Sequence, residues 1–213
     1  MRQFSTVFSE NYRTDIQLSR HQAAIIGQTI WCSGPGSNVL VFGLGNDSLL
    51  WNKLNAHGRT VFVENNKTWA KDMRERWPEL EIERVSYGKS TVESSLPIDE
   101  KALIEHPIPG FMRDIKWDVI LIDGPMGFRS TSPGRALPIY WSYVTARECT
   151  HIFIDDCNRR LEGEYTAKFF PGTERVVVNV PRVMKLGKPS KEWMSWVVGG
   201  EVNRSGFGGG SNF

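Results

Sequence analysis

The chain has 213 residues, and its 40% hydrophobic and 23% charged content is that of an ordinary globular protein long enough for one α/β domain. A formal net charge of +2 argues against a protein that is held on nucleic acid mainly by charge. Cys32, Cys149 and Cys157 are too few and too scattered for a disulfide framework, and no apolar run is long enough to span a membrane. We therefore expect a soluble, cytoplasmic protein with no nucleic-acid or membrane partner. Nothing in the pattern indicates an oligomeric state.

Three regions follow one another along the chain. Residues 1–36 are expected to form an N-terminal arm and a helix, with the helix over 21–31. Residues 37–200 carry the alternating pattern of the main domain, and 201–213 form a Gly-rich tail that we expect to be flexible.

Short apolar runs alternate with helical segments in the main domain. Strands are expected over 39–42, 60–63, 81–87, 117–122 and 151–154, and helices over 49–54, 67–77, 136–147 and 159–169. Residues 94–114, with three prolines, are expected to be irregular, and 175–180 and 193–198 are expected to pair as a late antiparallel hairpin at the sheet edge. Strands that alternate with helices predict a Rossmann-like, doubly wound α/β fold with a mostly parallel sheet. Ligands of such sheets bind beyond the carboxyl ends of the strands.

A glycine turn follows the first expected strand. Gly43 and Gly45 lie between that strand and the next helix, where glycine allows a tight turn and a close approach of a ligand. Asp47 or Ser48 is expected to cap the helix. Glu64 comes 21 positions after Gly43, at the end of the second strand, where a carboxylate can accept hydrogen bonds from both ribose hydroxyls of an adenosine. This spacing favours an adenosine cofactor over a plain strand–helix turn.

Sites for NAD and for S-adenosylmethionine (SAM) both use this arrangement. The dinucleotide fingerprint has a third glycine, for close helix packing beside a pyrophosphate, where this chain has Ser48. SAM carries no phosphate, so a SAM site does not need this third glycine. The pattern favours SAM, and NAD stays open as the alternative cofactor.

Acidic residues lie at the ends of the fourth and fifth expected strands. Asp123 ends the fourth strand, Asp155 and Asp156 end the fifth, and Asn158 follows closely. Adjacent parallel strands would bring Asp123, Asp155 and Asp156 together, either to bind a hard divalent cation or to supply a general base for an acceptor. Helix N-capping is the alternative for Asp156 and Asn158. For Asp123 we favour a functional role, because the following Gly124-Pro125 places it at a turn.

Two arginines, Arg129 and Arg135, lie on the loop after Asp123. A guanidinium there could hold the carboxylate of an acceptor in a bidentate pair. A solvated loop arginine is the alternative, and we prefer it for Arg129.

Several long motifs resemble those of one family. The segment Val41–Trp51, VFGLGNDSLLW, is similar to the nucleotide-site motif of the plant glucuronoxylan 4-O-methyltransferases and their irregular-xylem relatives. Four further segments resemble theirs in the same order: Gly58–Glu64, Trp117–Pro125, Ser132–Arg135 and Ile154–Glu162. The resemblance runs from about residue 15 to about residue 170.

The resemblance implies a class I methyltransferase that transfers a methyl group from SAM to the 4-hydroxyl of glucuronic acid side chains of a polysaccharide. The matched positions assign the cofactor to Gly43, Gly45, Asp47 and Glu64, catalysis to Asp123 and Asp156, and the acceptor to Arg135 and Asn158. The family commonly has histidine where Asn46 and Asp155 stand, and a Golgi membrane anchor that this chain does not show. A chain trimmed from an anchored precursor would belong in the Golgi lumen.

Three alternatives stay open beside this acidic-sugar acceptor. The chain could be an N- or O-methyltransferase of a free small-molecule metabolite, an NAD-dependent oxidoreductase, or a SAM-fold protein that binds without catalysis. A binding screen with SAM, S-adenosylhomocysteine (SAH) and NAD separates the cofactors. An acceptor screen over uronic-acid sugars and small amines separates the acceptors.

Overall fold

The computed structural model describes residues 3–147, 149–171, 174–180 and 193–199. Within these residues a seven-stranded sheet has the order β3-β2-β1-β4-β5-β7-β6. The strands are β1 (Asn38–Phe42), β2 (Arg59–Glu64), β3 (Glu81–Arg84), β4 (Val119–Ile122), β5 (His151–Ile154), β6 (Glu174–Val180) and β7 (Trp193–Gly199). The helices are α1 (Phe4–Asn11), α2 (Arg20–Cys32), α3 (Ser48–Leu54), α4 (Lys67–Arg76), α5 (Glu100–Ile104), α6 (Gly110–Arg113), α7 (Ala136–Thr145) and α8 (Arg160–Phe169).

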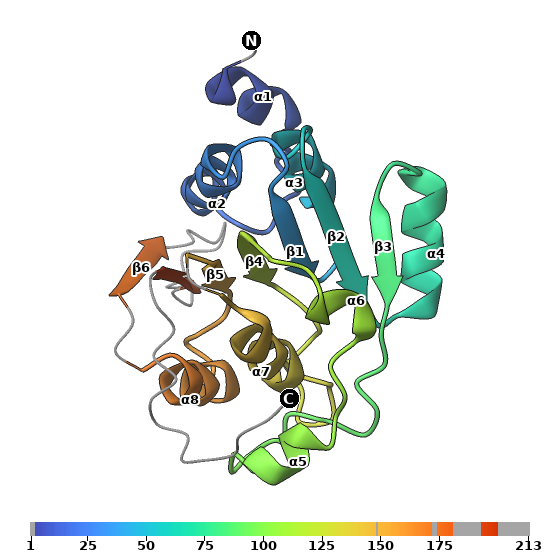
Figure 1. Ribbon diagram of the computed structural model, residues 1–213, viewed down its shortest axis with the longest axis vertical. Coiled ribbons are helices and arrows are strands. Elements are labelled where there is room, and N and C mark those ends of the chain that lie inside the picture. Colours follow the sequence, from blue (N-terminus) through green and yellow to red (C-terminus); the bar gives the residue numbers. More distant parts are fainter. Residues whose placement is uncertain (1–2, 148, 172–173, 181–192, 200–213) are drawn as a thin grey trace, which may run out of the picture.

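The chain builds the sheet outward from β1 in two directions. β1 pairs in parallel with β2 on one side and with β4 on the other, so the strand order reverses between β1 and β4. β5 continues the parallel part beside β4, and β7 and β6 add an antiparallel hairpin. Figure 1 shows β1, β2 and β4 in the middle of the molecule, with α4 beside β3 at one edge. The predicted mostly parallel sheet with a late antiparallel hairpin is confirmed.

Each face of the sheet carries its own core. Val39 and Val41 of β1 belong to the core that α1, α2 and α3 cover, whereas Leu40 and Phe42 belong to the core under α7 and α8. All four side chains are buried. Burial on both faces explains why this strand is a continuous apolar run and not an alternating one. The predicted double winding of the sheet is therefore confirmed.

The segment 94–114 differs from the irregular stretch that we predicted, because it contains α5 and α6. The Asp99 side chain caps α5, since its Oδ1 accepts hydrogen bonds from the backbone N–H groups of Lys101 and Ala102. Met112 of α6 is buried in the core under α7. The two helices have only five and four residues, which is too short for a hydrophobic period to show in the sequence.

The N-terminal residues pack onto the same domain. Phe8 of α1 and Ile26 of α2 lie in one core with residues of β1 and α3. Ser19 Oγ accepts from the backbone N–H of Gln22, and Gln22 Oε1 accepts from the backbone N–H of Ser19, so a capping box starts α2. The predicted domain division stays a prediction, and the predicted tail 201–213 lies outside the described residues. Within the described ranges, no helix has both the length and the apolar character needed to cross a bilayer.

Candidate active site

A cavity of about 570 Å³ opens at the carboxyl ends of β1, β4 and β5, where the strand order reverses. Doubly wound sheets bind their ligands at this position, in sites of about 300–1,000 Å³. The tip of β1, the loop after β4, the turn after β5 and the segment before α2 supply the walls. The lining includes Gly43, Gly45, Asp47, Trp69, Asp123, Arg135, Asp155, Asp156 and Arg159.

Hydrogen bonds between the strands place the predicted carboxylates side by side. The backbone N–H of Asp123 donates to Phe42 O at 2.9 Å. The backbone N–H of Asp155 donates to Ile122 O at 3.0 Å. Asp123 and Asp155 thus continue the hydrogen-bonded ladder one residue beyond β4 and β5. The backbones at these strand ends therefore stay about 4.8 Å apart, the usual distance between neighbouring strands.

Gly43 is required for a packing contact that the sequence did not indicate. Its φ of +112° lies in the region that favours glycine, and a Cβ there would lie 3.0 Å from the Gly124 backbone nitrogen. A Cβ on Gly124 would in turn lie 2.7 Å from Gly43 Cα. The tips of β1 and β4 therefore touch backbone to backbone at the floor of the site.

The start of α3 turns two side chains back toward the glycine turn. Ser48 Oγ accepts a hydrogen bond from the Gly45 backbone N–H at 3.0 Å, and Asp47 Oδ2 accepts one from Trp51 Nε1 at 3.0 Å. Asp47 occupies the predicted N-cap position, but its side chain makes no cap hydrogen bond. Burial raises the pKa of Asp47. A carboxylate therefore lies in the cavity wall beside the bare backbone of Gly45.

Glu64 ends β2 as predicted, but it is buried and does not line the cavity. Its Oε1 accepts a hydrogen bond from the Asn66 backbone N–H at 2.6 Å, and burial raises its pKa. Trp69 of α4 does line the cavity, and its Nε1 donates to Leu44 O at 2.6 Å. The indole thus lies against the glycine turn, a contact that no sequence pattern indicated.

Arg135 lies at the centre of the acidic residues, with only 4% of its surface exposed. Its Nη2 is 3.1 Å from Asp123 Oδ1 and 2.9 Å from Asp156 Oδ2, and its Nη1 is 3.7 Å from Asp155 Oδ2. Nη1 also donates to Asp155 O at 2.6 Å, and Nη2 donates to Asp123 O at 2.7 Å. These contacts occupy both terminal nitrogens. Arg135 therefore joins the tips of β4 and β5, and its predicted contact with an acceptor stays a prediction.

The carboxyl groups of Asp123 and Asp155 act on each other's pKa, and their interaction favours the protonated form of Asp155. Burial, opposed by Arg135, raises the pKa of Asp123 to about 6. Burial and the charge of Asp123 raise the pKa of Asp155 to about 7. Asp155 therefore keeps its proton to a higher pH than Asp123, and Asp123 is the first of the two to ionise as the pH rises. The pair therefore presents a carboxylate that is more basic than an ordinary aspartate.

Asp156 connects two arginines. Its Oδ2 lies 2.9 Å from Arg135 Nη2 and 2.8 Å from Arg159 Nη1. Its φ of +61° is uncommon for a residue with a side chain and is often seen at functional turns. Glu162 of α8 is fully buried, and neither of its carboxylate oxygens has a hydrogen-bond partner in the described part of the chain. The negative charge of Glu162 adds to the field that keeps Arg135 protonated.

Two further predictions, a divalent cation and an acceptor contact by Asn158, are not shown by the structure and stay predictions. Asp123, Asp155 and Asp156 surround the Arg135 guanidinium where we predicted a divalent cation. Among the residues that the structure describes, no group of three His, Cys, Asp or Glu side chains could hold a metal ion. Asn158 is exposed in the turn before α8, outside the cavity lining, and the N-cap of α8 is Arg159.

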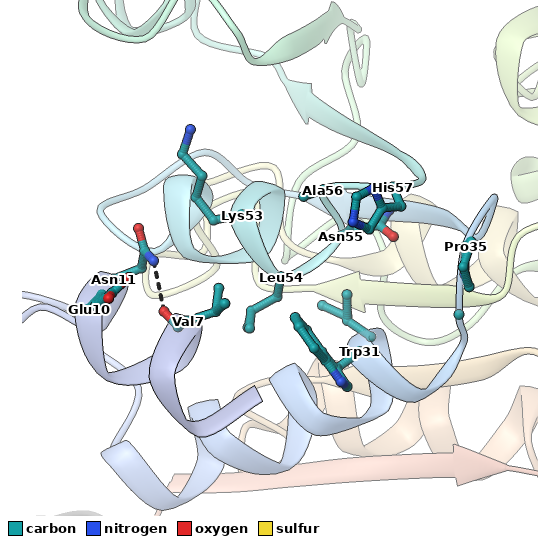
Figure 2. A pocket seen from close by; sticks show the side chains of 12 residues that line it. Val7, Glu10, Asn11, Trp31, Pro35, Lys53, Leu54, Asn55, Ala56 and His57 are labelled. Atoms are coloured by element: carbon teal, nitrogen blue, oxygen red, sulfur yellow. Dashed lines mark hydrogen bonds between the residues drawn. The ribbon is translucent and has the colours of Figure 1, made fainter. Parts of the chain in front are cut away.

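A second cavity, of about 640 Å³, includes Pro35 and His57, which lie just before β1 and β2 (Figure 2). Val7 of α1, Trp31 of α2 and Leu54 of α3 line it. Among its polar residues, Asn11 Nδ2 donates to Val7 O at 2.7 Å, and Lys53 Nζ lies 3.6 Å from Glu79 Oε1. The walls are largely apolar, so the acid–base chemistry belongs to the cavity at the strand tips.

Several known proteins are similar to this chain in sequence. A family model described as IRX15/IRX15L/GXM matches residues 22–106 and 96–185. Glucuronoxylan 4-O-methyltransferase 2 of Arabidopsis thaliana is 35% identical over 158 residues, which cover 63% of this chain and 54% of that protein. Arabinogalactan O-methyltransferase 2 of the same plant is 33% identical over 157 residues, which cover 62% of this chain and 54% of that protein. The chain spans about half the length of these curated relatives.

A solved structure shares the fold. An O-methyltransferase from Bacillus cereus, solved in complex with SAH, is similar with a TM-score of 0.53 and 17% sequence identity. The similarity covers 92% of this chain and 88% of that one. The predicted Rossmann-like fold is confirmed.

Proposed function

The chain belongs to the IRX15/IRX15L/GXM family, and from this premise we propose that it is a SAM-dependent methyltransferase acting on a hydroxyl of an acidic sugar. The 4-hydroxyl of a glucuronic-acid side chain, as in glucuronoxylan, is the acceptor that the names of the relatives suggest. One observation carries the proposal. A raised-pKa carboxylate, Asp123, stands beside a glycine turn in one cavity at the point where the strand order reverses.

The cavity fits SAM in size and in charge. Its volume of about 570 Å³ suits a small molecule, and Gly45 leaves bare backbone in the wall. SAM carries positive charge on its sulfur and its amino group, and the Asp47 carboxylate in the same wall complements that charge. We assign Gly43, Gly45 and Asp47 to this ligand. Glu64, buried at the tip of β2, keeps the proposed role of binding the ribose hydroxyls; because it does not line the cavity, this role requires its carboxylate to turn toward the ligand on binding.

Bound SAM supplies a methyl group on a positively charged sulfur, which an acceptor oxygen can attack. Asp123 would accept the proton of the acceptor hydroxyl as the new oxygen–carbon bond forms and the bond from the methyl carbon to sulfur breaks, which leaves SAH as the second product. Its pKa of about 6 leaves it ionised at neutral pH and more basic than an ordinary aspartate. Holding acceptor and methyl donor in line supplies a further large part of the rate.

The neighbouring residues position this base. Arg135 holds the Asp123 carboxylate at 3.1 Å, and Asp155, with the higher pKa, keeps its own proton to a higher pH than Asp123 does. Asp156 holds Arg135 at 2.9 Å, and we assign it to orientation of the site. Arg135 supplies the positive charge between the carboxylates, so the proposal contains no divalent cation. Asn158, exposed beside the cavity turn, is left for contact with an outer part of the acceptor.

Methyl transfer from labelled SAM tests the proposal. The acceptors are a xylo-oligosaccharide with an unmethylated glucuronic acid side chain, arabinogalactan, and a set of small amines and phenols. We expect label in the uronic-acid sugars, no transfer by Asp123→Asn, and full transfer by the control Asp114→Asn, which removes an exposed aspartate outside the cavity. Label only in free metabolites would select the small-molecule alternative. Full activity of Asp123→Asn would remove Asp123 as the base.

A further inference from the structure

We propose that Arg159 and Phe128 form the subsite that recognises a uronic-acid residue of the acceptor. The Arg159 guanidinium binds the sugar carboxylate, and the Phe128 ring packs against an apolar face of the sugar. The purpose of this subsite rests on the proposed function, but its binding chemistry does not require methyl transfer.

Arg159 is the cation of the cavity whose free donors are accessible, because the Nε of Arg135, which has no hydrogen-bond partner in the described structure, is buried. The cavity lining contains two cations, Arg135 and Arg159. Carboxylates and carbonyls already occupy both terminal nitrogens of Arg135. Arg159 pairs through Nη1 with Asp156 at 2.8 Å, and no hydrogen bond within the described structure uses its Nη2 or Nε. Its side chain is 29% exposed, so these donors can meet a ligand.

Asp156 also fixes where the Arg159 guanidinium lies. The carboxylate bridges Arg159 to the buried Arg135, which is itself joined to the tips of β4 and β5. A guanidinium held in this way loses less conformational freedom when it binds an anion. It can then form a charge-assisted pair with a ligand carboxylate.

Phe128 adds an apolar surface at the same cavity. Phe128 and Met126 line the cavity and are each 61% exposed, on the loop between β4 and α7. Arg129 lies over the Phe128 ring at 5.4 Å from its centroid, which leaves the rest of the ring open to solvent. Exposed aromatic side chains at a binding site pack against flat apolar faces of ligands, and a pyranose ring presents such a face of C–H groups.

Gly127 joins the two parts of the subsite. A Cβ at this position would lie 3.6 Å from Arg159 Nη1 and 2.9 Å from Glu162 Oε1. The loop backbone therefore runs directly beside the Arg159 guanidinium, one residue before Phe128. A ligand in this place meets a cation and an apolar ring together. A sugar that carries a carboxylate matches both features, whereas a neutral sugar matches only the ring and an amine is repelled by the cation.

Calorimetric binding of two oligosaccharides tests the subsite. One is a xylo-oligosaccharide with a glucuronic acid side chain, and the other is its carboxyl-reduced counterpart, each titrated with and without SAH. We expect Arg159→Ala to weaken binding of the uronate about 10- to 100-fold, the usual value of a charge-assisted hydrogen bond, and to leave the reduced sugar unchanged. The affinity of Arg159→Lys for the uronate should lie between those of the wild type and Arg159→Ala, because lysine keeps the charge and loses the planar donors. Phe128→Ala should weaken both sugars alike.

Arg160→Ala is the matched control, because Arg160 is the next residue, is exposed, and pairs with Glu164 outside the cavity. It should bind both sugars as the wild type does. The inference is overturned if the wild type does not bind the uronate, or if Arg159→Ala affects both sugars equally or neither. A wild type that binds the uronate without methylating it would refute the proposed function and leave the subsite intact. Methylation without any preference for the carboxylate would refute the subsite alone.

Discussion

Replacement of Gly124 by alanine should destabilise the domain and disturb the site. The new Cβ would lie 2.7 Å from Gly43 Cα and 3.0 Å from Gly43 N, which are backbone atoms that cannot rotate away. The strand tips must therefore separate. Overpacking of this kind costs about 1–3 kcal/mol. In a domain of this size each kcal/mol lowers the melting temperature by about 2–4 °C, so the expected decrease is about 2–12 °C.

Thermal unfolding followed by circular dichroism measures this decrease. Gly110→Ala is the control, because a Cβ at Gly110, the first residue of α6, meets no heavy atom within 4 Å. Alanine there should leave the melting temperature unchanged or raise it slightly, since it only restricts the unfolded chain. Affinity for SAH should fall in Gly124→Ala and stay constant in Gly110→Ala. If Gly124→Ala melted like the wild type, the backbone contact between β1 and β4 would be refuted.

Three further results are expected. The kcat/KM of methyl transfer should rise with pH through about 6, because Asp123 must lose its proton to act as the base, and a flat profile would contradict that role. The free energy of unfolding should fall as the pH rises from about 4 toward 7. The pKa of Asp155 is about 7 in the folded state and 3.8 as its ordinary value, so in this pH range the folded state binds the proton more tightly than the unfolded state does. Asp155→Asn imitates the protonated carboxyl and should show a weaker fall in stability, whereas an unchanged pH dependence would contradict the raised pKa of Asp155. Arg135→Met removes the cation from a buried acidic cluster and should cost about 3–5 kcal/mol in denaturant unfolding, and a variant as stable as the wild type would contradict the central place of Arg135.

The regular strands and the strand-tip carboxylates could be predicted because their signals are local. Val39 to Phe42 is an unbroken apolar run, which is typical of a strand buried on both faces. The parallel arrangement then brings Asp123 and Asp155 to one edge of the sheet, whatever the details of packing. The short helices α5 and α6 could not be predicted in this way, because neither is long enough to show a period.

The arginines of the site show the limit of local signals. Arg135 follows a Gly- and Pro-rich loop, which is typical of exposed residues, yet the fold buries it among three aspartates. Sequence spacing predicted that carboxylates would meet but could not show that a guanidinium would lie between them. Trp69 was missed and Arg159 was not assigned to the site for the same reason, since their contacts with Leu44 and Asp156 depend on how helices pack against the strand tips.

A crystal structure of the chain with SAH tests the location of the cofactor most directly. The account predicts electron density for the ligand in the cavity at the tips of β1 and β4, with its backbone contacts at Gly45 and its charged amino group near Asp47. Under saturating SAH, a cavity without that density, or SAH bound in the apolar cavity beside Trp31, would contradict the account.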